Sequence, residues 1–343
     1  MKHLFLSFLV LMYLSAQAHL PQKVILCGVG KNVESSISYS MKIMEKIGSL
    51  FSDYRIIIYE NNSSDDTPSL VKQWAENNDR VFAISEYVEK NVLEKILVNR
   101  LDNNDFHPPE AIARARNIVL KHALSDVYKD FDYLIWMDMD FIIEPNYEGF
   151  EEIFTTTQEW DAVFAYGIKY TETFWDFYAF RDPCYPLGSE LLGNDWWYLP
   201  KSLVFKKNDP WYPVYSAFGG CGIYKKSSLK GCSYSALVTD DLEQFSHTII
   251  EKHSSHPMVK KYFENLKNLN KTVFIPSPQD ALNDIRDKSV GIITHPLFNK
   301  VIWRMSSYAY KYPSVCEHVP LHASMIIRGH DKLFINPRLV FHY

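Results

Sequence analysis

The sequence has no long run of lysine or arginine and no excess of positive charge. Its 343 residues hold 36 Lys and Arg against 41 Asp and Glu, which gives a formal net charge of −5. Proteins that bind nucleic acid neutralise backbone phosphates with clustered cations. Because such a cluster is missing, we do not expect nucleic acid as a partner.

Cysteine pairs at metal-binding spacing are also missing. The five cysteines form no C-x-x-C pair, so the sequence does not predict a zinc site. In an oxidising compartment we expect one or two disulfides and a leftover thiol, with Cys221 and Cys232 as one candidate pair. Cys27 lies inside an apolar run and is expected to be a buried free thiol.

Long apolar runs are absent except at the N-terminus. Leu4 to Leu14 follows a short positive start, and Ala16-Gln17-Ala18 is a small-x-small cleavage site. Since a membrane span needs roughly 20 apolar residues, this segment predicts a removed signal peptide (1–18), with an uncleaved signal anchor as the alternative. We therefore expect a protein that is secreted or lies in the lumen of the secretory pathway, without a transmembrane span after signal removal.

The rest of the chain has the composition of an ordinary globular protein. Hydrophobic residues make up 47% and charged residues 22%. Strand-like runs at 23–30, 54–59, 81–85 and 133–137 alternate with helical patterns at 35–50, 67–75 and 110–123. This βαβ rhythm predicts an α/β fold, a mostly parallel sheet flanked by helices. Residues 94–109 are expected to be irregular, 240–270 helical, and 290–294 and the segment ending at His342 strands.

The strongest chemical signal is Asp138-Met139-Asp140, which directly follows an apolar strand. In an open α/β sheet, ligands bind beyond the carboxyl ends of the strands. Two carboxylates at that position can hold a hard divalent cation such as Mn²⁺ or Mg²⁺, which would neutralise a diphosphate. The alternative is a pair of solvated turn carboxylates.

Two weaker signals precede this motif. The loop from Glu60 to Thr67 follows a strand and leads into a helix N-terminus, so it can contact a nucleotide or can simply be a well-capped turn. Arg114, Arg116 and Asn117 share the helix before the Asp-x-Asp strand. These arginines can brace a phosphate pocket or form surface salt bridges.

In order and spacing, the three signals resemble the GT-A glycosyltransferases, above all family 2 and its relatives. Ser63, Asp65 and Thr67 match the family's Asp-x-x-Ser-x-Asp-x-Thr loop, and Arg116-Asn117 match its Ala-Arg-Asn helix. The resemblance implies a GT-A fold over 19–343, with a nucleotide-sugar-binding half (19–166) and an acceptor-binding half (167–343). It also implies metal-dependent transfer of a sugar, expected to be a hexose, from a nucleotide-diphosphate sugar to a glycan, protein or other hydroxyl acceptor.

The resemblance assigns roles to individual residues of this chain. Asp138 and Asp140 are expected to bind the metal ion, Mn²⁺ or Mg²⁺. His342 is either a third ligand or simply an exposed residue. The expected donor contacts are Glu60, Asn62, Ser63, Asp65, Arg114, Arg116, Asn117 and Asp138.

The second half resembles the capsule-type mannosyltransferases. The segment 218–224 matches their glycine turn before a strand, and Glu317-His318 lies where inverting relatives carry a Glu-Asp pair with the catalytic base. Glu317 is thus the expected base. His318 is expected to orient Glu317, to contact the donor phosphate, or to act as the base in place of Glu317. Asp240-Asp241 is a third candidate for the base. Relatives of this kind either invert or retain, so both stereochemical outcomes stay open.

Some features depart from the family or suit other proteins. Many relatives carry Asp at the position of Glu60, and no Gln-x-x-Arg-Trp follows Glu317, so a processive synthase is not expected. The aromatic segment 171–214 suits sugar recognition or a packed loop core. A binding protein without turnover and a nucleotidyltransferase remain alternatives. The nucleotidyltransferase is weaker because the loop from Gly28 to Asn32 is poor in glycine, and Val33 breaks the G-x-G-x-x-G of a dinucleotide dehydrogenase.

Overall fold

The computed structural model describes residues 20–97, 108–141, 143–169, 172–192, 203–272, 291–293, 301–303 and 315–342. The expected signal peptide lies outside these residues. The main helices are α2 (Glu34–Gly48), α3 (Thr67–Asn77), α4 (Lys90–Ile96), α5 (Pro108–Ala123), α6 (Glu148–Thr155), α7 (Ser189–Leu192), α8 (Asp240–Lys252), α9 (Pro257–Thr272) and α11 (His318–Ile327). The strands are β1 (Leu20–Gly30), β2 (Phe51–Asn61), β3 (Val81–Glu86), β4 (Tyr133–Asp138), β5 (Ala162–Ile168), β6 (Tyr212–Pro213), β7 (Cys221–Lys225), β8 (Gly291–Ile293), β9 (Val301–Trp303) and β10 (Leu333–His342).

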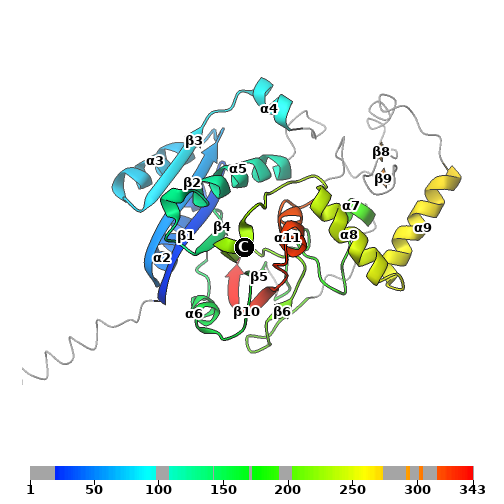
Figure 1. Cartoon of the computed structure of the whole chain (residues 1–343). Coiled ribbons are helices and arrows are strands. Elements are labelled where there is room, and N and C mark those ends of the chain that lie inside the picture. The colour runs from blue at the N-terminus through cyan, green and yellow to red at the C-terminus, as the bar shows by residue number, and fades with distance from the viewer. Residues whose placement is uncertain are drawn as a thin grey trace, which may run out of the picture.

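One sheet takes strands from both halves of the chain (Figure 1). Its eight strands run in the order β3-β2-β1-β4-β7-β5-β10-β6. The first four are parallel, β5 and β10 are parallel to each other, and β7 runs antiparallel between β4 and β5. The predicted mostly parallel α/β fold is therefore confirmed. The carboxyl ends of β1, β2, β3, β4, β5 and β10 lie at one edge of the sheet, where β7 begins.

Helices cover both faces of the sheet because side chains alternate along each strand. Leu26 and Ile58 join a core beneath α2, α3 and α6. Their neighbours Cys27 and Tyr59 join a second core, on the opposite face, with α5, α8 and α11. A strand buried on both faces cannot shift without exposing apolar surface, so the residues at its carboxyl end are held in place.

The expected disulfide between Cys221 and Cys232 is wrong, since all five cysteines are free. Cys221 starts β7 and is buried on the α2 and α6 face, whereas Cys232 is buried on the α11 face. The sheet thus separates the two sulfurs despite their closeness in sequence. Cys27 is a buried free thiol as predicted, and burial raises the pKa of its thiol.

The helices differ from expectation in two places. Helix α4 (Lys90–Ile96) runs into the start of the segment 94–109 expected to be irregular, and the helical stretch near 240–270 is divided into α8 and α9. The break lies at His253 to His256, directly before Pro257, which cannot donate a backbone hydrogen bond within a helix. Among the described residues, no helix has both the length and the apolarity needed to cross a bilayer.

Candidate active site

Asp138 and Asp140 stand at the carboxyl end of β4 with an inward residue between them. The backbone N–H of Asp138 donates to the carbonyl of Gly220 over 3.1 Å, so the glycine turn before β7 holds the end of β4. Met139 is buried against Gly28, where an added Cβ would lie 2.6 Å from its sulfur. Since Met139 points inward, the Asp138 side chain is 27% exposed and Asp140 is exposed.

These two carboxylates suit a hard divalent cation, because Mg²⁺ and Mn²⁺ prefer oxygen ligands and often take only one or two carboxylates beside substrate phosphates. The third expected ligand, His342, ends β10 and pairs with Ile168 of β5. In the sheet order, β10 is the third strand from β4, a spacing of roughly 14 Å. Accordingly, the described residues contain no group of three or more His, Cys, Asp or Glu side chains placed to hold a metal ion.

Arg116 is a buried cation that joins two of the predicted site residues. Its Nη2 lies 3.1 Å from Asp138 Oδ1, and its Nε lies 3.2 Å from Glu317 Oε1. The side chain is 3% exposed. Burial alone would lower the pKa of Arg116, but the Glu317 and Asp138 carboxylates outweigh burial and raise it. Arg116 therefore remains charged and orients both acids.

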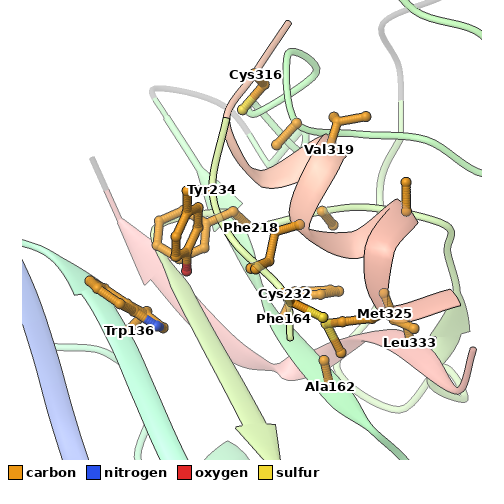
Figure 2. Packing of buried hydrophobic residues seen from close by; sticks show 14 of the residues in the cluster. Trp136, Ala162, Phe164, Phe218, Cys232, Tyr234, Cys316, Val319, Met325 and Leu333 are labelled. Atoms are coloured by element: carbon orange, nitrogen blue, oxygen red, sulfur yellow. The ribbon is translucent and has the colours of Figure 1, made fainter. Parts of the chain in front are cut away.

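Aromatic rings enclose this guanidinium on its other side. Its central carbon lies 4.8 Å from the ring centre of Phe218, 5.3 Å from that of Trp136 and 5.7 Å from that of Tyr234. Figure 2 shows Phe218 and Tyr234 near the start of α11, with Trp136 on β4. The ring faces attract the cation, and the Nη1 group has no hydrogen-bond partner.

Glu317 and His318 lie where α11 begins. Glu317 is nearly buried, with a 9% exposed side chain, and its carboxylate meets Arg116 and the Cys316 thiol. The His318 ring stacks on Phe218 with centres 3.9 Å apart. Burial, followed by the charge of Arg116 and by His322, lowers the pKa of His318 well below its ordinary value. His318 is therefore a neutral imidazole at physiological pH.

Asp176 is an acid of this cluster that the sequence did not single out as a catalytic candidate. Its carboxylate accepts the N–H of Gly219 over 3.0 Å and that of Ala179 over 3.3 Å. Burial raises its pKa to about 6, and the nearby Glu317 charge adds to this rise. Asp176 thus fixes the glycine turn that holds Asp138. It lies in an aromatic segment without strand or helix periodicity, so only its residue type could have suggested a role.

The predicted donor loop is tied to the loop after β1 by reciprocal capping. The side chains of Ser63, Asp65 and Thr67 accept the N–H groups of residues 32–34, where α2 begins. In return, Asn32 and Glu34 side chains accept the N–H groups of residues 64 and 66, where α3 begins. Ser63 and Asp65 therefore have structural roles at the site edge.

The other expected donor contacts are spread over the same edge. Glu60 is buried and accepts the Ser63 N–H and the Ser85 hydroxyl. Asn62 adopts a left-handed backbone with φ 53° and bonds both backbone groups of Val88. These two residues close the end of β2.

The remaining residues of the Ala-Arg-Asn helix point in different directions. Arg114 binds Tyr59 and Glu86 at the ends of β2 and β3, while Asn117 pairs through its amide with the backbone of Tyr234. Arg116 alone reaches Asp138. Asp240 and Asp241 lie in the first turn of α8, which Thr239 caps, and Asp241 pairs with Arg328.

No protein-family model and no curated protein sequence matches this chain, whereas several solved structures are similar to it. TarS of S. aureus, residues 1–349, shares 12% identity over 62% of this chain and 50% of its own, with a TM-score of 0.36. The mannosyltransferase PcManGT of Pyrobaculum calidifontis, in complex with GDP-Man and Mn²⁺, shares 14% over 71% and 59%, with a TM-score of 0.38. Glucosyl-3-phosphoglycerate synthase of M. tuberculosis shares 15% over 62% and 60%, with a TM-score of 0.32. This chain thus spans about half to three fifths of these proteins, and a likeness so distant carries no conclusion about activity.

Proposed function

We propose that this chain is a metal-dependent glycosyltransferase that moves a hexose from a nucleotide-diphosphate sugar to a hydroxyl group of a glycan or protein. The observation that carries the proposal is the cluster Asp138–Arg116–Glu317 at the carboxyl edge of the sheet. One cation joins a carboxylate suited to a metal–diphosphate complex with a nearly buried carboxylate suited to proton transfer. The cluster lies at the edge where open α/β sheets bind ligands.

The residues divide the work as follows. Asp138 and Asp140 would hold the Mn²⁺ or Mg²⁺ ion, which neutralises the leaving diphosphate when bound. In an inverting reaction, the acceptor oxygen bonds to the anomeric carbon while the bond from that carbon to the diphosphate oxygen breaks. Glu317 would take the proton of the acceptor hydroxyl. The charged Arg116 would keep the Glu317 carboxylate oriented, whereas neither ring nitrogen of the neutral His318 has a hydrogen-bond partner among the described residues.

Trp175 is suited to the acceptor side of the same site. Its backbone N–H donates to Gly167 at the end of β5 over 3.1 Å. An added Cβ on Gly167 would lie 2.5 Å from the carbonyl oxygen of Gly219, in the turn that holds Asp138. Trp175 is 38% exposed, and Lys169 Nζ lies 5.8 Å from the centre of its ring. A flat, partly exposed ring beside a cation suits a sugar with its hydroxyl groups.

The test of the proton acceptor is Glu317→Gln. The amide keeps the shape of the carboxylate but cannot accept the proton, so kcat should fall by roughly 10²–10⁴-fold with donor affinity nearly unchanged. Asp240→Asn serves as the matched control, because Asp240 lies in the first turn of α8, whose cap is Thr239. Full activity of Glu317→Gln, together with loss of activity in Asp240→Asn, would transfer the role to the α8 loop. If the product keeps the donor's anomeric configuration, no such base is needed.

The reaction products distinguish the proposed glycosyltransferase from a nucleotidyltransferase. Sugar transfer releases a nucleoside diphosphate, whereas nucleotidyl transfer releases pyrophosphate. Direct measurement of the released phosphate compound distinguishes these reactions, and a binding protein without turnover would release neither.

A further inference from the structure

A positive charge, that of Arg116, lies beside Asp138, although a site that binds a metal cation does not need one there. Arg116 Nη2 lies 3.1 Å from Asp138 Oδ1, the same carboxylate that is suited to hold a divalent ion. A metal ion bound to that carboxylate would therefore lie within a few ångströms of a fixed positive charge. Like charges at such distances repel strongly wherever water is excluded.

Arg116 cannot easily move away from this position. It is buried, it also binds Glu317, and three aromatic rings surround it. Its orphaned Nη1 group indicates that packing, not a full set of hydrogen bonds, holds the guanidinium. A long side chain free in solvent could retreat from an arriving cation, but this one is fixed by its surroundings.

We propose that Arg116 is a resident counter-cation that weakens the binding of a divalent metal to the Asp138–Asp140 pair, and that Glu317 moderates this effect by sharing its charge. This inference rests on the metal site of the proposed function. Its consequence is that the two carboxylates hold a metal ion weakly by themselves. Phosphate oxygens of a donor then supply the additional negative charge and the remaining ligands.

The experiment measures binding of Mn²⁺ alone to the full chain, by electron paramagnetic resonance or calorimetry, in matched variants. Arg116→Met removes the charge but keeps a long apolar side chain against the rings, and it should tighten Mn²⁺ binding roughly tenfold or more. Arg116→Lys keeps the charge and should leave the affinity within about threefold of wild type. An unchanged or weaker affinity in Arg116→Met would overturn the proposal, since a bracing residue would affect stability only.

Glu317→Gln tests the same idea from the opposite side and covers the case in which Arg116→Met does not fold. Removing this anion leaves more of the Arg116 charge facing Asp138, so Mn²⁺ binding should weaken several-fold. Unchanged Mn²⁺ affinity in Glu317→Gln would also contradict the proposal. Asp140→Ala separates this proposal from the function it rests on. If neither wild type nor Arg116→Met binds Mn²⁺, or if Asp140→Ala binds it as well as wild type does, the metal site itself is wrong.

Discussion

At the scale of single residues, the fold buries several charges beside the metal-binding candidates, the partly exposed Asp138 and the exposed Asp140. Arg116 is held by two carboxylates, and Asp176 by two backbone N–H groups. Residue types along the chain pointed to Asp138, Glu317 and Arg116. The sequence could not reveal that Arg116 is buried, because an arginine between Ala115 and Asn117 fits an exposed helix equally well. The burial follows from the packing of α5 between β1, β2 and the segments around residues 218 and 234, which lie far away in sequence.

Asp176 gives a pH-dependent prediction. Burial raises its pKa to about 6 from an ordinary value of 3.8, so the folded protein holds this proton more tightly than the unfolded chain. Its contribution to stability is therefore full below about pH 4 and is lost as the pH rises to about 6, by about 3 kcal/mol at most. Asp176→Asn cannot lose a proton. As the pH rises from about 4 to about 6, its free energy of unfolding should therefore increase relative to that of wild type.

The measurement is urea unfolding of both proteins at intervals from pH 4 to pH 6.5. The comparison must be a difference, because burial lowers the pKa of His322 to about 3, and that group costs stability as the pH falls below about 6.5. The His322 contribution is common to both proteins and cancels. Parallel curves for wild type and Asp176→Asn would show that Asp176 is ionised at both ends of the range.

At the scale of elements, the carboxyl edge depends on how helices begin. Helix α2 has no cap from its own N-cap residue, Val33. Thr67, the first residue of α3, supplies a side-chain acceptor instead, because the Thr67 hydroxyl accepts the Val33 N–H over 2.9 Å. The sequence indicated that the loop at 60–67 ends in a capped helix. It did not indicate that the cap serves a different helix, because the pairing of two loops depends on the parallel register of β1 and β2.

Thr67→Val tests this reciprocal capping. Valine fills the same buried space but offers no oxygen, so the free energy of unfolding should fall by about 1 kcal/mol without any ligand present. Thermal or urea unfolding measures the effect, and Thr157→Val, at an exposed position after α6, should change little. Equal stability of Thr67→Val and Thr157→Val would mean that this loop is not tied to α2, and that its polar residues are available for a donor.

At the scale of the whole molecule, two halves of the chain form one sheet. The βαβ order predicted the parallel strands β1 to β4 with bounds that lie within three residues of those observed. It could not place β7, which returns from the second half and inserts antiparallel between β4 and β5. No local pattern encodes pairing between strands about ninety residues apart. That insertion brings the glycine turn to Asp138, and with it Asp176 and the segment of Trp175.

Trp175 allows a test of the proposal that the second half of the chain binds the acceptor. Trp175→Ala should raise the KM for a saccharide acceptor roughly tenfold, a size typical of losing one aromatic contact. Hydrolysis of the donor in the absence of acceptor should not change if Trp175 contacts only the acceptor, as we propose. Phe263→Ala, with a similar exposed fraction on α9, is the control. A Trp175→Ala protein that transfers to saccharides as well as wild type would contradict this placement.

The most direct test of the proposed function is release of nucleoside diphosphate from a panel of nucleotide sugars, with Mn²⁺ and with excess chelator. Wild type should release it with at least one donor and only when metal is present. Asp140→Ala should abolish release while leaving unfolding almost unchanged, since an exposed carboxylate contributes little to stability. Asp130→Ala, an exposed residue near the opposite end of β4, should be fully active. Release that persists in chelator, or that survives Asp140→Ala, would contradict the metal-dependent transferase.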